Sequence, residues 1–342
     1  MKHDLIEYAH GIYALDSGYL REQLAAVHII HHQGRLAIID TGTFKILPHV
    51  LNALKTLGAE PNDVDYVMLT HIHLDHAGGA GVMMKAFPQA RLVVHPRGAR
   101  HMASPAQLIA GVEAVYGKAR TRELYGEILP IPAARMIEAP DNTTIHLADR
   151  PLLCLDTPGH ARHHIVIYDA DSKGVFTGDM LGISYPALIA NGKPFLFPTT
   201  TPSQFDPIAM RQSVERILAM QSEAAYLTHF GRLLSPQQHA PALLRRMDAF
   251  VRMAKAAKQK VGIPRGLSRD GLKPAGRAGD TTPEALYPDL HATLCVNLRD
   301  YLFAEVRAHG VTTDDATLNA ILDMDVDLNA QGLALWANTV TA

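Results

Sequence analysis

Short apolar runs alternate with polar breaks through the first part of the chain, and their length and β-branched content predict strands. Five runs fit this pattern, at residues 11–15, 25–30, 35–39, 64–69 and 91–94. Apolar residues at helical spacing predict helices over residues 45–57 and 82–87. The first of these helices is expected to end at Gly58, because glycine readily adopts the left-handed conformation that closes a helix. The first part of the chain is therefore predicted to alternate strands with helices.

Strand patterns return after residue 150. Strands are predicted at residues 152–155, 165–168, 174–177 and 224–227, with a hairpin turn at 170–173. A long loop with prolines and aromatic residues is expected over residues 181–207, followed by a helix over 207–220.

The segment between these two strand-rich parts has a different pattern. Residues 101–139 are predicted to form an insertion with helices over 107–116 and 121–129. Such an insertion can cover a site, and Met102, Tyr116 and Tyr125 would suit the apolar wall of a pocket. The same residues would equally suit the core of a packed helical pair, so both interpretations stay open.

The last hundred residues are mostly helical in pattern. Helices are predicted over residues 240–260, 286–309, 316–322 and 328–337, with a Gly- and Pro-rich loop or linker over 262–283. We therefore divide the chain into a first domain, residues 1–239, and a helical C-terminal region, residues 240–342. The apolar stripes of this region are expected to pack on the first domain or on a second copy of the chain, which would make a homo-oligomer.

Composition and charge exclude several classes of protein. The 342 residues are 47% hydrophobic and 19% charged, which is typical of globular rather than disordered chains. A formal net charge of −2 offers no basic field for nucleic acid or an anionic membrane. The two cysteines, Cys154 and Cys295, are too few for a disulfide framework. Without an apolar leader or a long apolar stretch, the chain is expected to be cytoplasmic, with no membrane partner.

The most informative stretch follows the predicted strand at residues 64–69. His71, His73, Asp75 and His76 lie within six residues, directly before Gly78 and Gly79. Imidazole and carboxylate groups are the ligands that zinc and similar divalent metals prefer. His71 and His73 point to the same side of an extended chain, and Asp75 and His76 follow at the next turn. We interpret this stretch as a metal site, because a solvated polar loop does not require so many ligands together.

The spacing His71-x-His73-x-Asp75-His76 resembles the signature of the metallo-β-lactamase superfamily. Its hydrolase branches require three further ligands, and matching contexts follow in the required order. These contexts are Asp156-Thr157-Pro158-Gly159-His160, Val175-Phe176-Thr177-Gly178-Asp179 and Tyr226-Leu227-Thr228-His229. The resemblance spans about residues 11–230 and implies an α/β fold, namely an αββα sandwich of two mixed sheets covered by helices.

The resemblance also implies roles for the seven residues. One metal ion would bind to His71, His73 and His160, and a second to Asp75, His76 and His229, with Asp179 bridging the two. Zinc is expected, with iron or manganese as alternatives, because such ligands accept several metals. A hydroxide shared by the two ions would be the nucleophile, and Asp75 would be the catalytic residue that orients it.

The function implied by the resemblance is hydrolysis of an ester, thioester or lactone of a small acyl molecule. Hydroxyacylglutathione hydrolases are the most similar branch, although the C-terminal region shows no match to their glutathione-binding residues. Lactonases of acylated signal molecules remain an alternative within hydrolases. Two other classes also remain: a persulfide dioxygenase with one iron per chain, which oxygen uptake and metal counting would reveal, and a catalytically silent binding protein.

Five neighbouring residues have predicted supporting roles. Asp40 is expected behind the metal ligands, where it would orient one of them. His95 and His164 are interpreted as structural or supporting, and His163 as packed under the hairpin. Tyr185 is a candidate donor on the substrate side.

Overall fold

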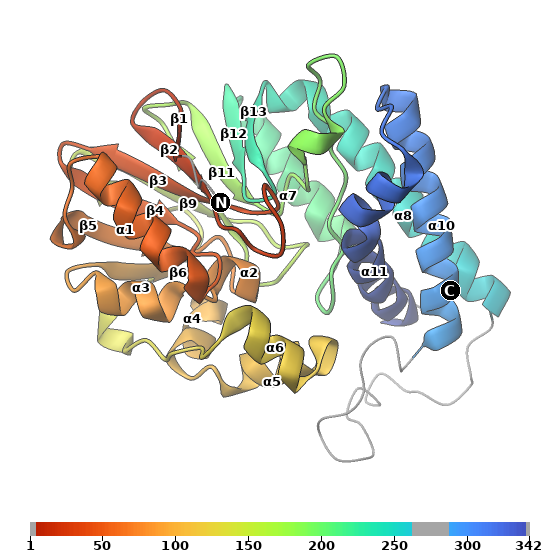
Figure 1. Cartoon of the computed structure of the whole chain (residues 1–342), viewed down its shortest axis with the longest axis horizontal. Coiled ribbons are helices and arrows are strands. Elements are labelled where there is room, and N and C mark those ends of the chain that lie inside the picture. Colours follow the sequence, from red (N-terminus) through yellow and green to blue (C-terminus); the bar gives the residue numbers. More distant parts are fainter. Residues whose placement is uncertain (1–4, 262–286, 340–342) are drawn as a thin grey trace.

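The computed structural model describes residues 5–261 and 287–339, in which two β-sheets lie face to face between layers of helices (Figure 1). Apolar residues from both sheets meet in a shared core, including Ile39 and Met68 from the first sheet and Leu152 and Ile165 from the second. This arrangement confirms the predicted αββα fold class.

The first sheet contains seven strands in sequence order. Its first four strands are antiparallel neighbours, and the last four, beginning with β4, run parallel. The strands are β1 (Leu5–Glu7), β2 (Ile12–Asp16), β3 (Ala26–His32), β4 (Arg35–Ile39), β5 (Val64–Met68), β6 (Arg91–Val94) and β7 (Met136–Glu138).

The second sheet has the order β13-β12-β11-β10-β9-β8 and is also mixed, because β11 and β12 are parallel while the other neighbours are antiparallel. Its strands are β8 (Thr143–Leu147), β9 (Arg150–Asp156), β10 (Ile165–Asp169), β11 (Gly174–Gly178), β12 (Ala224–Leu227) and β13 (Gly231–Leu234).

Helices cover the outer face of each sheet. Val50 of α1 and Met83 of α3 pack on the first sheet, whereas Val214 of α7 and Leu243 of α8 pack on the second. The helices are α1 (Leu47–Thr56), α2 (Leu74–Ala77), α3 (Ala80–Ala86), α4 (Pro96–Ala103), α5 (Ala106–Tyr116), α6 (Lys118–Tyr125), α7 (Pro207–Ala219), α8 (Pro236–Val261), α10 (Pro288–His309) and α11 (Asp315–Thr339).

Coverage on both faces explains why the central strands are apolar in continuous runs. Successive side chains of a strand point to opposite faces, so Ile29 of β3 joins the core under the helices and Ile30 joins the core between the sheets. Both positions are fully buried. A strand with water on one face would instead alternate apolar and polar residues.

Most predicted elements are present, but short edge elements were missed. The sequence pattern did not indicate β1, β7, β8, β13 or α4, because three- to eight-residue elements contain too few positions for a clear period. The predicted helix over 121–129 ends earlier, at Tyr125, because Gly126 adopts a φ of 63°. Met102 of α4 lies in the core outside the first sheet rather than in a pocket wall.

The C-terminal prediction needs one correction. The two helices predicted at 316–322 and 328–337 are a single helix, α11. Asp323, Asp325 and Asp327 interrupt the apolar pattern between them, yet the backbone remains helical and Asp325 is buried. The linker predicted at 262–283 lies outside the described residues.

Figure 1 shows α8, α10 and α11 packed together beside the two sheets. Leu294 and Leu302 of α10 and Leu322 of α11 belong to the same core as α8 and the outer face of the second sheet. The predicted division at residue 239 thus falls within α8, in a continuous apolar core.

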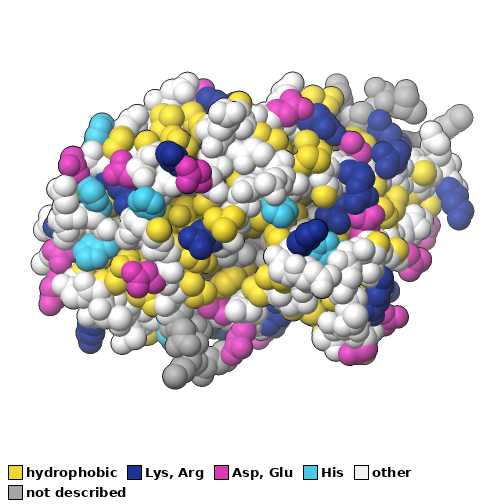
Figure 2. Space-filling view, turned by 90° about the horizontal axis from the view of Figure 1, so that it is seen from above, with side chains coloured by type: hydrophobic (Ala, Val, Ile, Leu, Met, Phe, Trp, Pro, Cys, Tyr) yellow, Lys and Arg dark blue, Asp and Glu magenta, His cyan; other side chains and the backbone are white. Residues whose placement is uncertain are grey.

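The surface mixes residue types. Figure 2 shows one face on which hydrophobic side chains cover the middle and basic side chains are more frequent toward the right-hand end. Among the described residues, no helix has the length and hydropathy needed to cross a bilayer.

The packing of α11 against the loop after β11 gives a first prediction. A methyl group at Gly332 would lie 1.7 Å from the Thr200 carbonyl oxygen, so Gly332→Ala forces the backbones apart. We expect the free energy of unfolding to fall by at least about 2 kcal/mol in chemical denaturation. Gly111→Ala in α5 is the matched control, because nothing lies within 4 Å there. It should be neutral or stabilising by about 0.5–1 kcal/mol. Equal stability of the two variants would contradict the close packing of α11.

Candidate metal centre

The seven predicted ligands converge at one edge of the two sheets. Each follows the end of a strand or lies in the short helix after β5, so the strands fix where each side chain starts. The contributing positions are His71 and His73 after β5, Asp75 and His76 in α2, His160 after β9, Asp179 after β11 and His229 after β12.

Two glycines allow the segments to approach so closely. A Cβ atom at Gly178 would lie 2.6 Å from Thr70 Oγ1 and 2.7 Å from His164 Nε2. A Cβ atom at Gly79 would lie 2.5 Å from the Thr41 carbonyl oxygen. Glycine therefore lets the backbone approach side chains at position 178 and another backbone segment at position 79.

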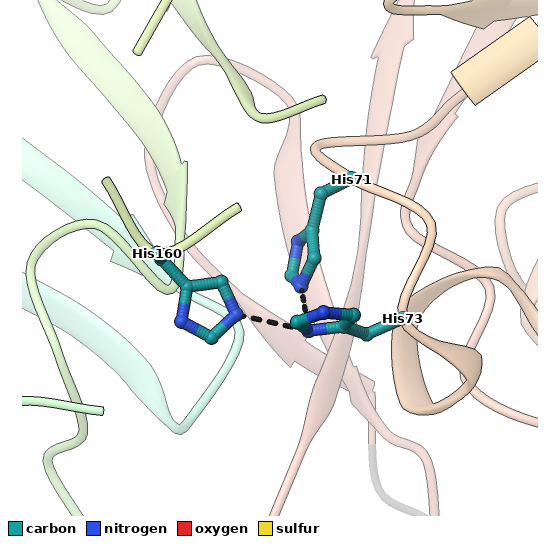
Figure 3. Close-up of side chains that lie close together, drawn as sticks. All are labelled: His71, His73 and His160. Carbon is teal, nitrogen blue, oxygen red and sulfur yellow. Dashed lines mark hydrogen bonds between the residues drawn. The ribbon is translucent and has the colours of Figure 1, made fainter. Parts of the chain in front are cut away.

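Three histidines form the first group (Figure 3). His73 Nδ1 lies 3.0 Å from His71 Nε2 and 2.9 Å from His160 Nε2. Burial, reinforced by the neighbouring imidazoles, lowers the pKa of His71 and His73 well below its usual value, and burial also lowers the pKa of His160. The three rings are thus neutral, which is the form that binds a metal.

The hydrogen-bond pattern leaves this group with too many lone pairs. Thr70 Oγ1 donates to Asp40, so at 3.2 Å it accepts from His71 Nδ1, which leaves His71 Nε2 without a proton. His160 Nδ1 faces the Thr199 carbonyl at 3.4 Å, which likewise leaves His160 Nε2 unprotonated. The single Nδ1 proton that His73 could carry cannot serve both neighbours. A cation between the three nitrogens would satisfy all of them.

Asp75, His76 and His229 form the second group, and Asp179 lies between the two groups. Asp179 Oδ1 is 3.1 Å from His76 Nε2 and 3.5 Å from His229 Nε2, while its Oδ2 is 3.3 Å from His160 Nε2. Asp75 Oδ2 is 3.3 Å from His229 Nε2. The Asp179 carboxylate therefore directs one oxygen to each group, as a bridging ligand would.

The charges of the second group also fit a cation. Among the described residues, the buried atoms His76 Nε2 and Asp179 Oδ1 have no hydrogen-bond partner of adequate geometry. Burial opposes charge on His76, but the carboxylates of Asp179, Asp75 and Asp40 outweigh it and hold the pKa of His76 well above its usual value. Without a metal, these carboxylates thus favour a proton on the ligand nitrogen. A divalent cation would supply the same positive charge between the groups.

Asp40 anchors this centre from behind. Its carboxylate accepts hydrogen bonds from the Thr70 backbone N–H at 2.8 Å, from His76 Nδ1 at 2.8 Å and from Thr228 Oγ1 at 2.9 Å. The bond from His76 Nδ1 leaves Nε2 directed toward Asp179. Asp40 is 1% exposed and follows β4 with a φ of 57°. Its predicted position behind the ligands agrees with this geometry.

Backbone carbonyls orient two further ligands. His229 Nδ1 donates to the Leu24 carbonyl at 2.9 Å, and the Thr199 carbonyl faces His160. The sequence offered no signal for Leu24 or Thr199, because any residue supplies a carbonyl oxygen.

A sequence profile of the metallo-beta-lactamase superfamily matches residues 21–229. The protein belongs to this superfamily. A hydroxyacylglutathione hydrolase from Roseobacter denitrificans is 26% identical over 277 residues, which cover 80% of this chain and 89% of that one. An acyl-coenzyme A thioesterase from Gallus gallus is 28% identical over 174 residues, or 46% of this chain and 57% of that one.

A solved structure supports the fold independently. The archaeal superfamily protein ST1585 from Sulfolobus tokodaii superposes with a TM-score of 0.54 at 22% identity, covering 78% of this chain and 94% of that one. In sequence, the metallo-beta-lactamase fold-containing protein ST1585 of Sulfurisphaera tokodaii is 24% identical over 232 residues, or 66% of this chain and 80% of that one.

Three further histidines support the superfamily centre without belonging to a ligand group. His164 Nε2 accepts from the Asp179 backbone N–H at 3.3 Å, and its Nδ1 contacts Thr157 Oγ1 at 2.9 Å. The ring centroid of His163 is 5.7 Å from that of His73, so His163 borders the ligand loop rather than only packing under the hairpin. His95 caps the start of α4, as its structural interpretation implies.

The structure corrects the role predicted for Tyr185. The sequence interpretation made it a donor to the substrate, but its side chain is buried and its hydroxyl donates to Asp325 Oδ1 at 3.0 Å. The Arg21 guanidinium lies 4.1 Å from the centre of the Tyr185 ring. The single hydroxyl proton is therefore used within the protein, and α11 is connected to the loop that follows Asp179.

Asp325 is a residue near the centre that the sequence did not indicate. Its Oδ2 is buried without a hydrogen-bond partner among the described residues. Burial raises the pKa of Asp325 to about 7, partly offset by His229, Tyr185 and Arg21, while Asp179 raises it further. A carboxyl group at this position is thus easier to keep neutral than charged.

The Asp40 contacts predict an effect on metal affinity. In Asp40→Asn, the amide retains one accepting oxygen for four donors, so His76 is oriented less firmly. We expect zinc affinity, measured by competition with a chelator, to fall about 10- to 100-fold. Asp65→Asn in β5, which alters a surface ion pair with Arg35, is the control. Unchanged affinity in Asp40→Asn would show that the buried carboxylate does not support the ligands.

The Asp325 pKa predicts a pH dependence in the metal-free protein. Since the folded pKa of about 7 lies above the unfolded pKa of about 3.9, the stability this group contributes is complete below pH 4 and is lost as pH rises through 7. Asp325→Asn has no such loss, so its free energy of unfolding relative to wild type should increase by on the order of 2–4 kcal/mol between pH 4 and pH 8. Denaturant titrations across this range measure it.

Asp323→Asn is the control, because Asp323 lies on the same helix and is exposed. It should not reproduce the pH-dependent change in stability expected of Asp325→Asn. If Asp325→Asn also ran parallel to wild type, Asp325 would have an ordinary pKa in the folded chain.

Proposed function

We propose that this chain is a metal-dependent hydrolase that binds two divalent cations and cleaves a thioester or ester bond of a small acyl substrate. The observation that carries this proposal is the pair of ligand groups with the Asp179 carboxylate between them. Similarity to a hydroxyacylglutathione hydrolase over 80% of the chain supports a thioester as the substrate.

The cations, with zinc as our first expectation, would supply a hydroxide nucleophile near neutral pH and would polarise the scissile carbonyl. Asp179 would hold both cations in place. The first would bind to His71, His73 and His160, and the second to Asp75, His76 and His229.

Asp75 is the ligand best placed to contact the reacting groups. Its side chain is 23% exposed, whereas those of His76, Asp179 and His229 are 0%, 5% and 7% exposed. The centre therefore opens to solvent beside Asp75. A carboxylate oxygen there can orient the attacking water, accept its proton and return that proton to the leaving thiolate or alkoxide.

Aromatic side chains lie near this open side. The hydroxyls of Tyr19 and Tyr125 are 2.6 Å apart, and the ring centroids of Tyr116 and Tyr125 are 6.4 Å apart. Burial and then the negative charge of Asp75 raise the pKa of Tyr116, so its hydroxyl keeps its proton. Tyr19 and Tyr125 are buried in the core. The half-buried Tyr116 of the 101–139 insertion is therefore the tyrosine best suited to contact an acyl group of mostly apolar character.

The test combines metal analysis with a substrate panel. Metal-loaded protein should contain two cations per chain and should release thiol from acyl thioesters faster than it opens lactones or cleaves phosphodiesters. Metal removal by a chelator should abolish turnover, and re-addition should restore it. Oxygen uptake with a persulfide, together with one iron per chain, would replace this proposal by a dioxygenase.

Substitutions test the assigned roles. Asp75→Asn should lower kcat at least about 100-fold because a positioned proton acceptor is lost. Asp179→Ala should reduce bound metal below two per chain, measured by elemental analysis. Asp171→Asn, in the exposed hairpin turn before β11, is the control and should retain both properties. Near wild-type turnover in Asp75→Asn, or two tightly bound ions in Asp179→Ala, would refute the respective assignment.

A further inference from the structure

A second kind of ligand cluster joins two helices of the C-terminal region. His291 and Cys295 lie one turn apart on α10, and Asp327 faces them from α11. His291 Nε2 is 3.0 Å from Asp327 Oδ1 and 3.4 Å from Cys295 Sγ. The three donor atoms all lie within 4.8 Å of one another, and the cluster shares no residue with the His/Asp centre.

This cluster adds a third donor atom to an ion pair between two helices. His95 and Asp156 also form a His–Asp pair, at 3.2 Å, but they belong to no group of three such donors within residues 5–261 and 287–339. In the C-terminal cluster, one nitrogen serves two partners. His291 Nε2 therefore lies within reach of both a carboxylate oxygen and a sulfur atom. A cation between the three atoms could be bound by all of them.

The donor chemistry indicates which cation would bind. Imidazole, thiolate and carboxylate together suit zinc or a similar borderline divalent ion, whereas magnesium and calcium prefer oxygen ligands alone. Residues four apart on a helix lie on one face, so His291 and Cys295 can bind the same ion. The Asp327 side chain is 47% exposed, which leaves a fourth position open to water.

A neighbouring amide holds the carboxylate in place. Gln331, one turn after Asp327 on α11, donates from Nε2 to Asp327 Oδ2 at 2.9 Å. The residue is 3% exposed. Because this bond occupies the second carboxylate oxygen, Oδ1 remains directed toward His291. Such support of a ligand carboxylate is typical of metal sites.

We propose that His291, Cys295 and Asp327 form a third metal site, which binds Zn²⁺ or a similar divalent cation and clamps α10 to α11. The clamp would stabilise the helix that brings Asp325 to Tyr185. The proposal does not depend on the substrate of that centre.

Cobalt gives a readout that the His/Asp centre cannot produce. Co²⁺ bound to a thiolate absorbs strongly in the near ultraviolet through sulfur-to-metal charge transfer, whereas imidazole and carboxylate ligands give no such band. Metal-free full-length protein titrated with Co²⁺ should develop this band, and a third equivalent should bind. Cys295→Ser should abolish the band. Cys154→Ala should retain it, because Cys154 is fully buried in β9.

A second pair of variants tests the site even if Cys295→Ser misfolds. Asp327→Asn should weaken the Co²⁺ affinity measured by this band at least tenfold, while Asp323→Asn, exposed on the same helix, should not. Hydrolytic turnover should change less than twofold in Cys295→Ser, because the residue lies outside the His/Asp centre. Absence of the band in wild-type protein, or its persistence in Cys295→Ser, would overturn the third site whether or not the chain is a hydrolase.

Discussion

The hydrogen bonds to the buried carboxylate of Asp40 are the interaction on which the candidate metal centre depends. They connect the ends of three strands, because Asp40 follows β4, Thr70 follows β5 and Thr228 follows β12 in the other sheet. Burying a carboxylate costs free energy unless several donors satisfy it. If the two sheet edges moved apart, the Asp40 carboxylate would lose donors while it stayed buried. The carboxylate therefore fixes the distance between the sheets at the point where the ligands meet.

The same anchor determines the chemistry of the ligands. Through Thr70 it leaves His71 Nε2 unprotonated, and its direct bond from His76 Nδ1 directs His76 Nε2 toward Asp179. Carbonyl oxygens repeat this arrangement for His160 and His229. Each of these four imidazoles is thus held through Nδ1 and directs Nε2 to the centre. The buried cluster thus has more lone pairs and carboxylate charge than its own protons satisfy. A bound cation would balance this excess.

The sequence predicted those parts of the centre that are local. A run of ligand-type residues as dense as His71 to His76 is rarely needed for structure alone. His160, Asp179 and His229 each follow a strand pattern that a few neighbouring residues are enough to predict. The partners of these ligands were not predictable in the same way. Leu24 and Thr199 act through carbonyl oxygens. The sequence predicted that Tyr185 contacts a substrate, but its hydroxyl donates to Asp325, 140 residues away. Contacts made by backbone atoms, or between distant segments, leave no period or motif in the sequence.

The acidic positions of α11 show why the apolar period alone can misplace the end of a helix when contacts with distant segments stabilise it. Asp323, Asp325 and Asp327 break the apolar period, so the sequence predicted two short helices with a gap. In the fold each has a separate environment: Asp323 pairs with Arg299 at the surface, Asp325 binds the Tyr185 hydroxyl, and Asp327 faces His291. A helix can accommodate polar residues in succession when each meets its own partner in a different direction. The helical tail is consequently part of the architecture around the metal centre, because the position of Tyr185 depends on a carboxyl group that only α11 supplies.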